Sequence, residues 1–370
     1  MTADVLTSAA LNRATLARQL LLERSSLAPV DAITHLVGLQ SQNPLDPYLS
    51  LWSRLDRFDP DAIGPLLEDR TLVRIVVMRG TIHLVTAADA CTLRPLTQPV
   101  LDAEIARHSE FAEHLVGVAM GPVLAFAHPL LSERPMAGGA LRTALAERFP
   151  DLHAAALAYA CRCLLPLVQV PPRGVWGRTL QVTSTPLDAW VGHPLDPAPS
   201  IDEVVLRYLA AFGPATPADA MAWSRLTGLR EVFDRLRPRL RVFHDERGRE
   251  LYDQPDAPRP RPDVPAPVRV LPEYDNLLLS HADRSRFSSE DVDLRARATG
   301  PVKGTVLVDG RVAAVWHSEV DRSTGAVVLV VEHLRLTARS RDRVEAEGRR
   351  AARFWHPTAT AHDVHLVPLL

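Results

Sequence analysis

The sequence predicts an α+β fold built from three tandem winged helix-turn-helix units and a C-terminal β-rich domain. Short helical patterns followed by a hairpin pattern occur three times along the chain. A proline-rich linker follows the third occurrence, and strand patterns dominate beyond it. We therefore expect domains at residues 1–110, 111–197, 198–256 and 257–370.

The first unit combines helices with one hairpin. Apolar residues recur at helical spacing in three segments and in the helix opened by Pro29. The three segments are 8–22, 47–55 and 60–68. The period then changes to that of strands over 72–78 and 81–86, with Arg79 and Gly80 at the turn.

The second and third units repeat this order. In the second, helices are expected over 138–148 and 152–165, and strands over 168–170 and 180–182. In the third, Ser200 and Thr216 are N-cap residues, and Pro217 suits the first position of the second helix. A third helix from Leu229 and strands over 241–244 and 250–252 complete this unit.

The last domain is expected to be mainly β. Strands are predicted at 268–271 and 326–332, with a possible edge strand at 365–367. The strongest hairpin signal is Asp309-Gly310, which suits a type I′ turn between two alternating strands. An arginine-rich amphipathic helix is expected over 337–354.

Composition excludes several classes of protein. The formal net charge is −2, from 42 Lys and Arg against 44 Asp and Glu, so no global basic charge announces a nucleic-acid partner. Three cysteines without a CxxC pattern argue against a disulfide framework or a structural zinc site. The N-terminus does not resemble a signal peptide, and no apolar run is long enough to span a bilayer. We expect a cytoplasmic protein without a membrane partner.

The most informative segment is Gly38-Leu39-Gln40-Ser41-Gln42-Asn43-Pro44. Pro44 disfavours a helical conformation at Asn43, so the helix opened by Pro29 is expected to end near Gln42. Both amides could then face one cavity. A glutamine cannot act as a general base near neutral pH, so chemistry here would consist of positioning a water or stabilising a cation. On spacing alone, backbone capping by the two amides is the favoured interpretation.

Other catalytic patterns are absent from the sequence. It contains no glycine-rich phosphate loop, no GxSxG and no HExxH. Glu273 and Asp275 could do acid–base work, but a structural role beside arginines is favoured. His83 is expected either as a hydrogen-bonded core histidine or facing the cavity of the glutamines. Arg79 suits a phosphate contact or a solvated turn equally.

Together these segments resemble the AlkZ-like (YcaQ-type) winged-helix DNA glycosylase family. The resemblance rests on the glutamine segment, on Met78-Arg79-Gly80-Thr81-Ile82-His83, on residues 271–284 from Leu271-Pro272-Glu273 onward, and on Val308-Asp309-Gly310. The family carries a Q-x-Q or Q-x-D motif with a usually hydrophobic middle residue. This chain departs from that pattern at Ser41, and Gln42 in place of Asp makes it more similar to the AlkZ branch.

The resemblance implies a function. The three units would form a C-shaped channel for duplex DNA, and Gln40 and Gln42 would be the catalytic pair. The activity implied is hydrolysis of the glycosidic bond of N7-alkylated guanine, with unhooking of interstrand crosslinks made by DNA-alkylating natural products, as self-resistance. No cofactor and no metal are expected, and the protein should act as a monomer. Candidate DNA contacts are Arg79, His83, Arg237, Arg239, Lys303, Asp309, Gly310 and Arg311.

Two further expectations concern mechanism. Lys303 is the only lysine, so a Schiff-base lyase step would need Lys303 or the N-terminal amine, and a monofunctional glycosylase is predicted. The Asp309-Gly310 hairpin is either inserted into a groove near the lesion or an ordinary edge hairpin. Two alternatives to the enzyme remain: a non-enzymatic winged-helix transcriptional regulator, and a scaffold protein without a nucleic-acid partner.

Overall fold

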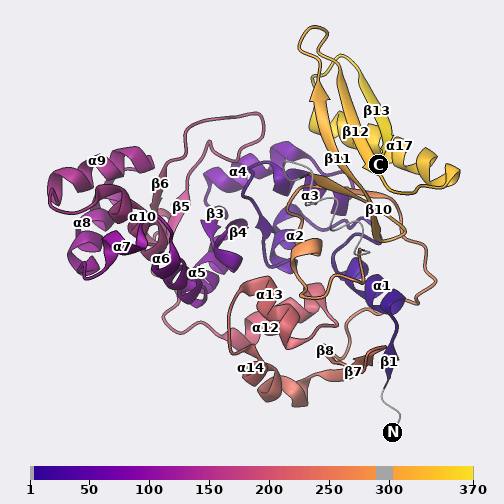
Figure 1. Cartoon of the computed structure of the whole chain (residues 1–370), viewed down its shortest axis with the longest axis horizontal. Helices are drawn as coiled ribbons and strands as arrows, with labels where there is room; N and C mark the ends of the chain where they lie inside the picture. The colour runs from indigo at the N-terminus through magenta and orange to yellow at the C-terminus, as the bar shows by residue number, and fades with distance from the viewer. Residues whose placement is uncertain (1–3, 289–302, 370) are drawn as a thin grey trace.

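The computed structural model describes residues 4–288 and 303–369 and has the predicted α+β architecture (Figure 1). Three β-sheets form within these residues; two of them join strands that are distant in sequence, and the C-terminal sheet pairs consecutive strands. Helices pack against the sheets, and the apolar cores between them extend from one sheet to the next.

The central sheet has the strand order β2-β4-β3-β5-β6 and is antiparallel throughout. Its strands are β2 (Leu39–Gln40), β3 (Leu72–Val76), β4 (Ile82–Thr86), β5 (Leu167–Gln169) and β6 (Ser184–Pro186). The expected hairpin of the first unit is therefore present. It shares one sheet with the strands of the second unit, so this sheet crosses the expected boundary at residue 110.

Helices surround this sheet. Those of the N-terminal part are α1 (Ser8–Arg18), α2 (Pro29–His35), α3 (Asp46–Arg54), the 3-10 turn η1 (Pro60–Ala62), α4 (Ile63–Glu68), α5 (Ala87–Leu96) and α6 (Gln98–Arg107). The first expected helix ends at Arg18 instead of residue 22, because Leu20 takes a left-handed conformation with φ of 57°.

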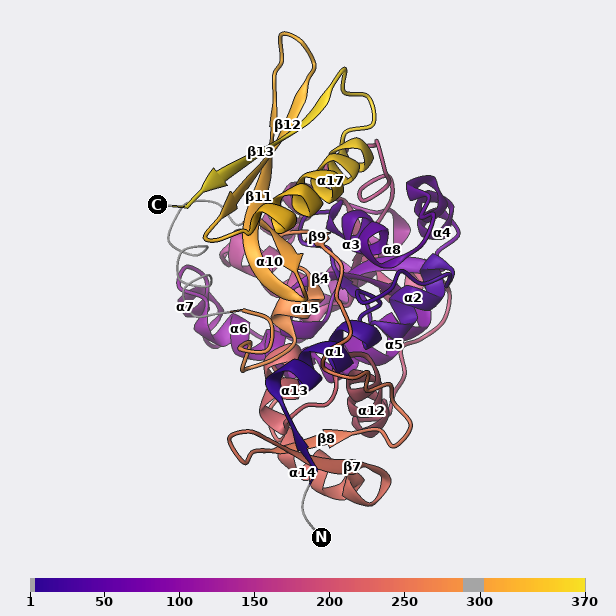
Figure 2. The ribbon, with the colours of Figure 1, turned by 90° about the vertical axis from the view of Figure 1, so that its right-hand side faces the viewer.

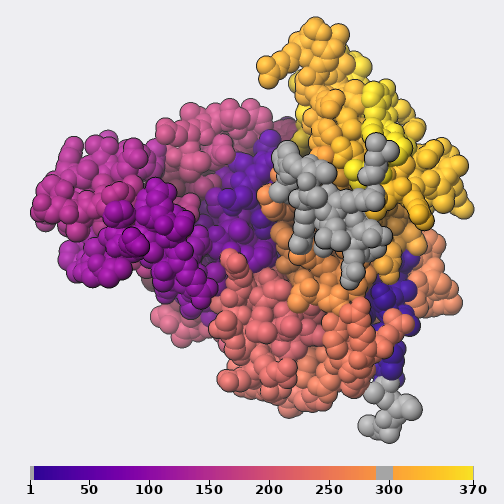
Figure 3. Space-filling model, viewed as in Figure 1, coloured from indigo at the N-terminus to yellow at the C-terminus, as the bar shows by residue number. Residues whose placement is uncertain are grey.

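A group of helices projects from one side of the molecule, as Figure 3 shows in magenta. It contains α7 (Ala112–Leu115), α8 (Met120–Glu133), α9 (Gly138–Arg148) and α10 (Ala154–Leu164), whose apolar faces form a separate small core. The strand expected at 180–182 is wrong. The chain returns to the sheet only at β6, where Thr185 donates a hydrogen bond from its buried hydroxyl to Leu131 O at 2.9 Å. The short helix α11 (Leu187–Val191) follows.

The third group has the expected helices and hairpin. They are α12 (Ile201–Phe212), α13 (Pro217–Ser224), α14 (Leu229–Leu236), the 3-10 turn η3 (Arg237–Arg239), β7 (Arg241–Asp245) and β8 (Glu250–Asp253). Thr216 and Asp219 form the reciprocal capping box predicted for α13. The N-terminal strand β1 (Val5–Leu6) adds to this hairpin in parallel with β7.

The C-terminal sheet has the order β13-β12-β11-β10-β9 (Figure 2). Its strands are β9 (Arg269–Leu271), β10 (Gly304–Val308), β11 (Arg311–Val320), β12 (Val327–His333) and β13 (His362–Pro368). The helices α15 (Asn276–Leu279) and α17 (Ala338–Trp355) belong to the same part of the chain. The Asp309-Gly310 turn has positive φ at both residues, 48° and 76°, as a type I′ turn requires. Helix α17 covers one face, and Val344 and Ala351 are buried there.

None of the helices in residues 4–288 and 303–369 combines the length and apolar character needed to cross a membrane.

Candidate active site

The two glutamines lie beyond the end of a helix, and the expectation that the helix continues to Gln42 is wrong. Helix α2 ends at His35, and the chain then passes through Val37 and Gly38 with φ of 55° and 91°. Gln40 belongs to strand β2, where it lies directly opposite His83 of β4.

Gly38 explains why the helix ends early. A Cβ at this position would lie 2.5 Å from Cγ1 of Val85, so only glycine permits this close approach between the chain and β4. The amide of Gly38 donates a hydrogen bond to Ile33 O at 2.9 Å, which closes the last turn of α2. Glycine after an apolar helical pattern is a known stop signal, and it would have predicted this end.

Gln40 is buried and held by a guanidinium. Arg79 donates to Gln40 Oε1 at 2.7 Å and also contacts His83 Nε2 at 3.1 Å. Because a guanidinium can only donate, the amide oxygen of Gln40 must face Arg79. The second end of Arg79 donates to Trp223 O of α13 at 2.7 Å, so this arginine joins the glutamine to the third group of helices.

Gln42 is exposed. The hydrogen bond to its side chain is a long one, in which the amide of Ile82 donates to Oε1 at 3.4 Å. The two glutamines therefore differ in environment although they are two residues apart. Gln40 has a fixed orientation, whereas Gln42 presents its amide to solvent.

The electrostatics of this cluster leave one permanent cation. Burial lowers the pKa of His83 to about 3, and Arg79 adds to this effect. Burial also lowers the pKa of Arg79, to about 10, with Arg225 as a second cause. Near neutral pH, His83 is therefore uncharged. It donates from Nδ1 to Thr81 O at 2.9 Å and accepts from Arg79, which stays charged.

Ser41 is the polar residue where the family pattern is usually hydrophobic, and Arg74 explains it. Both side chains are buried. Arg74 donates to Ser41 Oγ at 3.0 Å and to Ser41 O at 2.8 Å. Ser41 therefore belongs to a buried polar contact behind the glutamine pair.

The segment 273–276 supports the motif from the other side. Asn276 donates to Gly38 O at 2.6 Å and accepts from the amide of Gln40 at 3.3 Å. Asp275 accepts two hydrogen bonds of 2.7 Å from Arg54, and both side chains are fully buried. Asp275 thus has the favoured structural role. Sequence reasoning missed Asn276 and Arg74, because each acts on a segment more than 30 residues away.

Of the candidate DNA contacts, only Arg79 and His83 lie beside the glutamines. Arg237 pairs with Glu250 at 2.9 Å, and Arg239 lies 3.7 Å from Glu203. Lys303 pairs with Glu332 at 2.6 Å. Arg237 and Arg239 belong to η3, and Lys303 directly precedes β10.

The Asp309-Gly310 turn packs against helix α1. Asn12 donates to Gly310 O at 2.8 Å, and Arg13 pairs with Asp309 at 2.6 Å. Arg311 follows the turn and bonds to Ser285 O at 3.2 Å. In this conformation α1 covers Gly310, whereas the side chain of Asp309 stays 67% exposed.

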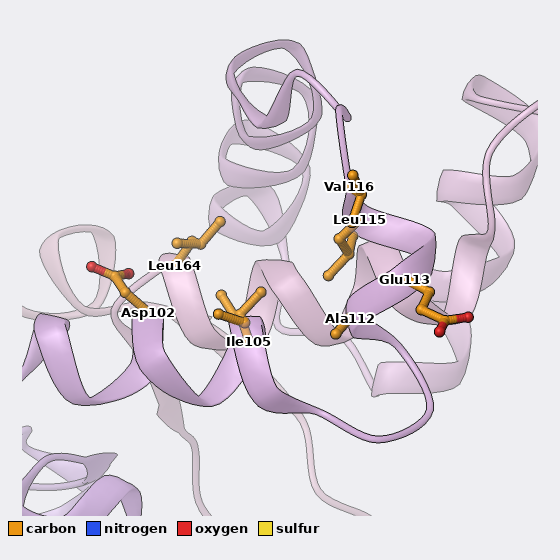
Figure 4. A pocket seen from close by; sticks show the side chains of 8 residues that line it. Asp102, Ile105, Ala112, Glu113, Leu115, Val116 and Leu164 are labelled. Atoms are coloured by element: carbon orange, nitrogen blue, oxygen red, sulfur yellow. The ribbon is translucent and has the colours of Figure 1, made fainter.

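A cavity of about 600 Å³ lies away from the glutamines, among α6, α7 and α10 (Figure 4). Apolar side chains such as Ile105, Leu115 and Leu164 line it, with Asp102 and Glu113 at its edge. It contains none of the polar groups described above.

Comparison with known proteins defines the class. The family model described as DNA glycosylase AlkZ-like matches residues 33–354, and the chain therefore belongs to the AlkZ-like DNA glycosylase family. Over 332 residues the chain is 25% identical to an interstrand DNA cross-link repair glycosylase of Streptomyces sahachiroi, with 81% of this chain and 84% of that protein aligned. The solved structure of Streptomyces sahachiroi DNA glycosylase AlkZ is similar with a TM-score of 0.77 and 22% identity, covering 98% of this chain and 100% of that one.

Proposed function

We propose that this protein hydrolyses the glycosidic bond of N7-alkylated guanine in duplex DNA and unhooks interstrand crosslinks that contain it. The observation that carries the proposal is the glutamine pair at the end of β2, one amide clamped by Arg79 and the other exposed. Membership of the AlkZ-like family and the crosslink-repair relative support it. Self-resistance to a DNA-alkylating natural product is the proposed biological role.

The residue types suit this reaction. N7-alkylguanine is cationic, so its glycosidic bond is already weakened and the base can leave without a general acid. The enzyme then has to orient a water toward C1′ and stabilise the developing positive charge on the sugar. We assign the water to the exposed Oε1 of Gln42. Gln40, whose oxygen is bound by Arg79, orients the motif and presents its amide to the same place.

A lyase step is not part of the proposal. Lys303 would be the amine for a Schiff base within the chain, but its Nζ is paired with Glu332 and its side chain is only 14% exposed. The proposed enzyme is therefore monofunctional and leaves an abasic site. Efficient β-elimination that disappears in Lys303→Ala would contradict this.

DNA is proposed to contact exposed arginines outside the motif. Arg239 and Arg311 are exposed, and Arg237 keeps nearly half of its side chain accessible beside Glu250. A phosphate could compete with the carboxylate partners of Arg237 and Arg239. The C-shaped channel of three winged-helix units, and action as a monomer, belong to the same proposal.

The test is single-turnover release of 7-methylguanine from duplex DNA by the wild type, Gln40→Ala, Gln42→Ala and the double variant. Amide positioning is worth a few kcal/mol of barrier, so each single change should slow release by roughly 100-fold or more. DNA affinity should be retained. The double variant should lose little more than the worse single variant, because the two residues act as a unit.

Three results would count against the proposal in different ways. Absence of release from both methylated and crosslinked duplexes, with salt-dependent DNA binding intact, would favour the regulator. No DNA binding at all would favour the scaffold. Undiminished release by Gln42→Ala would remove the assignment of the water.

A further inference from the structure

A polar cavity, separate from the apolar one among α6, α7 and α10, lies next to the glutamine motif, between the start of α3 and the C-terminal sheet. It has a volume of about 220 Å³ and is lined by Asn43, Asp46, Glu273, His317 and Trp355, among others. Liquid water occupies roughly 30 Å³ per molecule, so a small organic group fits here. Asn43 follows Gln42 directly in the chain, which places the cavity beside the candidate active site.

Asp46 is the unexplained group of this cavity. Its side chain is 3% exposed, and Oδ2 has no hydrogen-bond partner within residues 4–288 and 303–369. It is the first residue of α3, but the N-cap residue is Leu45, and the helix has no side-chain cap. A buried carboxylate oxygen without a partner is costly, and its place in the fold does not explain it.

His317 supplies a second unpartnered acceptor. Its Nε2 lies 3.2 Å from Glu319 Oε1, and because a carboxylate oxygen accepts, the ring proton of the neutral histidine belongs on Nε2. Nδ1 is then an acceptor, and this buried atom too has no partner among the described residues. Glu273 adds a carboxylate at the exposed edge.

The lining is therefore rich in acceptors, and it gains negative charge when Asp46 is ionised. We propose that this cavity binds an alkylammonium group through the unpartnered Oδ2 of Asp46, with Glu273 and His317 Nδ1 as further acceptors in the lining. A water molecule donates only two hydrogen bonds and carries no charge to offset the carboxylates. An anion is repelled. The described residues include no group of three His, Cys, Asp or Glu side chains arranged to hold a metal ion.

Binding should be linked to the release of a proton. The pKa of Asp46 is raised to about 8, first by burial and then by the negative charges of Glu273 and Asp275. Burial also raises the pKa of Glu273. Further charged or titratable groups near the lining are His317 with its partner Glu319, and Arg54, which neutralises Asp275. An ammonium needs the ionised carboxylate, so a proton on Asp46 competes with the ligand below about pH 8.

The experiment titrates the full chain with n-butylammonium chloride and follows tryptophan fluorescence, since Trp316 and Trp355 line the cavity. An alkylammonium stays charged below about pH 10. Affinity should therefore rise about tenfold per pH unit between pH 6 and 7.5 and level off above pH 8. Butanol at the same concentration should not bind. Sodium chloride at equal ionic strength corrects for charge screening.

Variants locate the site. Asp46→Asn should weaken binding at pH 8.5 at least tenfold and remove most of the rise in affinity between pH 6 and 8, leaving the part that comes from Glu273. Glu273→Gln, at an exposed position that does not threaten folding, should weaken binding as well. Asp151→Asn, an exposed acid before α10, is the matched control and should bind like the wild type. Three results would overturn the proposal. The first is no binding by the wild type at pH 8.5, and the second is binding of butanol or Mg²⁺ in place of the amine. The third is that Asp46→Asn and Glu273→Gln both bind the amine as tightly as the wild type.

A second arm, which rests on the proposed function, identifies the source of the ammonium. It compares single-turnover release of N7-methylguanine with that of an N7-(aminoalkyl)guanine. If the adduct carries the ammonium, the ratio of aminoalkyl to methyl release should fall at least tenfold in Asp46→Asn. An unchanged ratio would identify a free amine as the ligand. Absence of release from either substrate would count against the proposed function alone, because the fluorescence titration needs no DNA.

Discussion

Neighbouring glutamines in this protein have unequal surroundings because of one residue, Arg79. Its guanidinium orients the amide of Gln40, contacts His83 and reaches the backbone of Trp223. Arg79 itself has a left-handed backbone with φ of 59°, which is uncommon for a residue other than glycine. The turn of the first hairpin thus directs an arginine inward, toward the motif.

Arg79 should act as a positioning residue. Arg79→Ala should lower the single-turnover rate of base release by about tenfold to 100-fold, because Gln40 loses its buried donor. Arg79→Lys should restore part of the rate, since an ammonium can still donate to one acceptor. The rate at saturating enzyme and the dissociation constant for DNA would be measured separately.

Arg237→Ala provides the comparison, because Arg237 is a proposed DNA contact that pairs with Glu250 and not with Gln40; it should weaken DNA binding and leave the saturated rate unchanged. If Arg79→Ala weakened DNA binding and left the saturated rate unchanged, Arg79 would instead be the phosphate contact predicted from the sequence. A reduced rate with unchanged affinity distinguishes the two roles.

Buried histidines should make stability depend on pH. Burial lowers the pKa of His281 from 6.5 to about 3, so the folded chain keeps it neutral while the unfolded chain protonates it below pH 6.5. The folded state is therefore favoured above pH 6.5 and loses stability as the pH falls from 6.5 toward 3. Between pH 7 and pH 5, this single group should lower the free energy of unfolding by about 2 kcal/mol.

His281→Gln isolates this contribution, because Gln can still donate a hydrogen bond to Phe212 O. The free energy of unfolding would be measured with urea for wild type and variant at pH 7 and pH 5. The difference between the two proteins should be about 2 kcal/mol smaller at pH 5 than at pH 7. The similar shift of His83 cancels in this comparison. A difference that does not change with pH would mean that His281 is protonated in the folded protein.

At the scale of elements, the β10–β11 hairpin has the predicted turn but a different setting from a free tip. Gly310 is buried against α1, and a Cβ there would lie 2.5 Å from Leu16 Cδ1. Asp309, in contrast, keeps 67% of its side chain exposed while pairing with Arg13. The turn therefore fastens the first helix to the C-terminal sheet.

This setting predicts unequal effects of two adjacent substitutions. Gly310→Ala should reduce the free energy of unfolding by about 2 kcal/mol or more, from left-handed strain and overlap with Leu16. Asp309→Ala should cost about 1 kcal/mol at most, because the ion pair is largely solvated. Urea unfolding at pH 7 would measure both changes in the free energy of unfolding. A stable Gly310→Ala protein that fails only on crosslinked DNA would support insertion of the hairpin into a groove.

Across the whole molecule, the N-terminal helix joins parts of the chain that are more than 190 residues apart. Arg18 of α1 donates to Asp253 at 2.6 and 2.8 Å and to Leu209 O at 3.0 Å, and Arg18 and Asp253 are fully buried. Arg259 of the proline-rich linker also contacts Asp253. One buried ionic group thus holds α1, the third helical group and the linker together.

Loss of Arg18 should lower the stability of the whole fold. Arg18→Met leaves Asp253 buried with one cation fewer and should reduce the free energy of unfolding by at least about 3 kcal/mol. Arg235→Met removes an exposed, solvent-screened pair with Asp202 and should leave the free energy of unfolding almost unchanged. Urea unfolding followed by circular dichroism would measure both. A loss for Arg18→Met no larger than that for Arg235→Met would show that α1 does not support the rest of the fold.

Local chemistry was sufficient for much of the secondary structure and for the motif. The start of α13 is defined by Thr216, Pro217 and Asp219, and the turn between β10 and β11 is defined by Asp309-Gly310. Capping and turn preferences depend on a few adjacent residues. The glutamine segment indicated the glycosylase family only together with the segments 78–83, 271–284 and 308–310, which are also read directly from the sequence. These features require no knowledge of distant contacts.

The surroundings of the motif were decided by tertiary structure alone. Arg79 faces Gln40 because α13 offers it the carbonyl of Trp223. The partners of Gln40 lie 39 and 236 residues away in the sequence. No local propensity encodes such contacts. The sequence by itself therefore determined which residues form the pair, and folding determined that one amide is clamped while the other meets solvent.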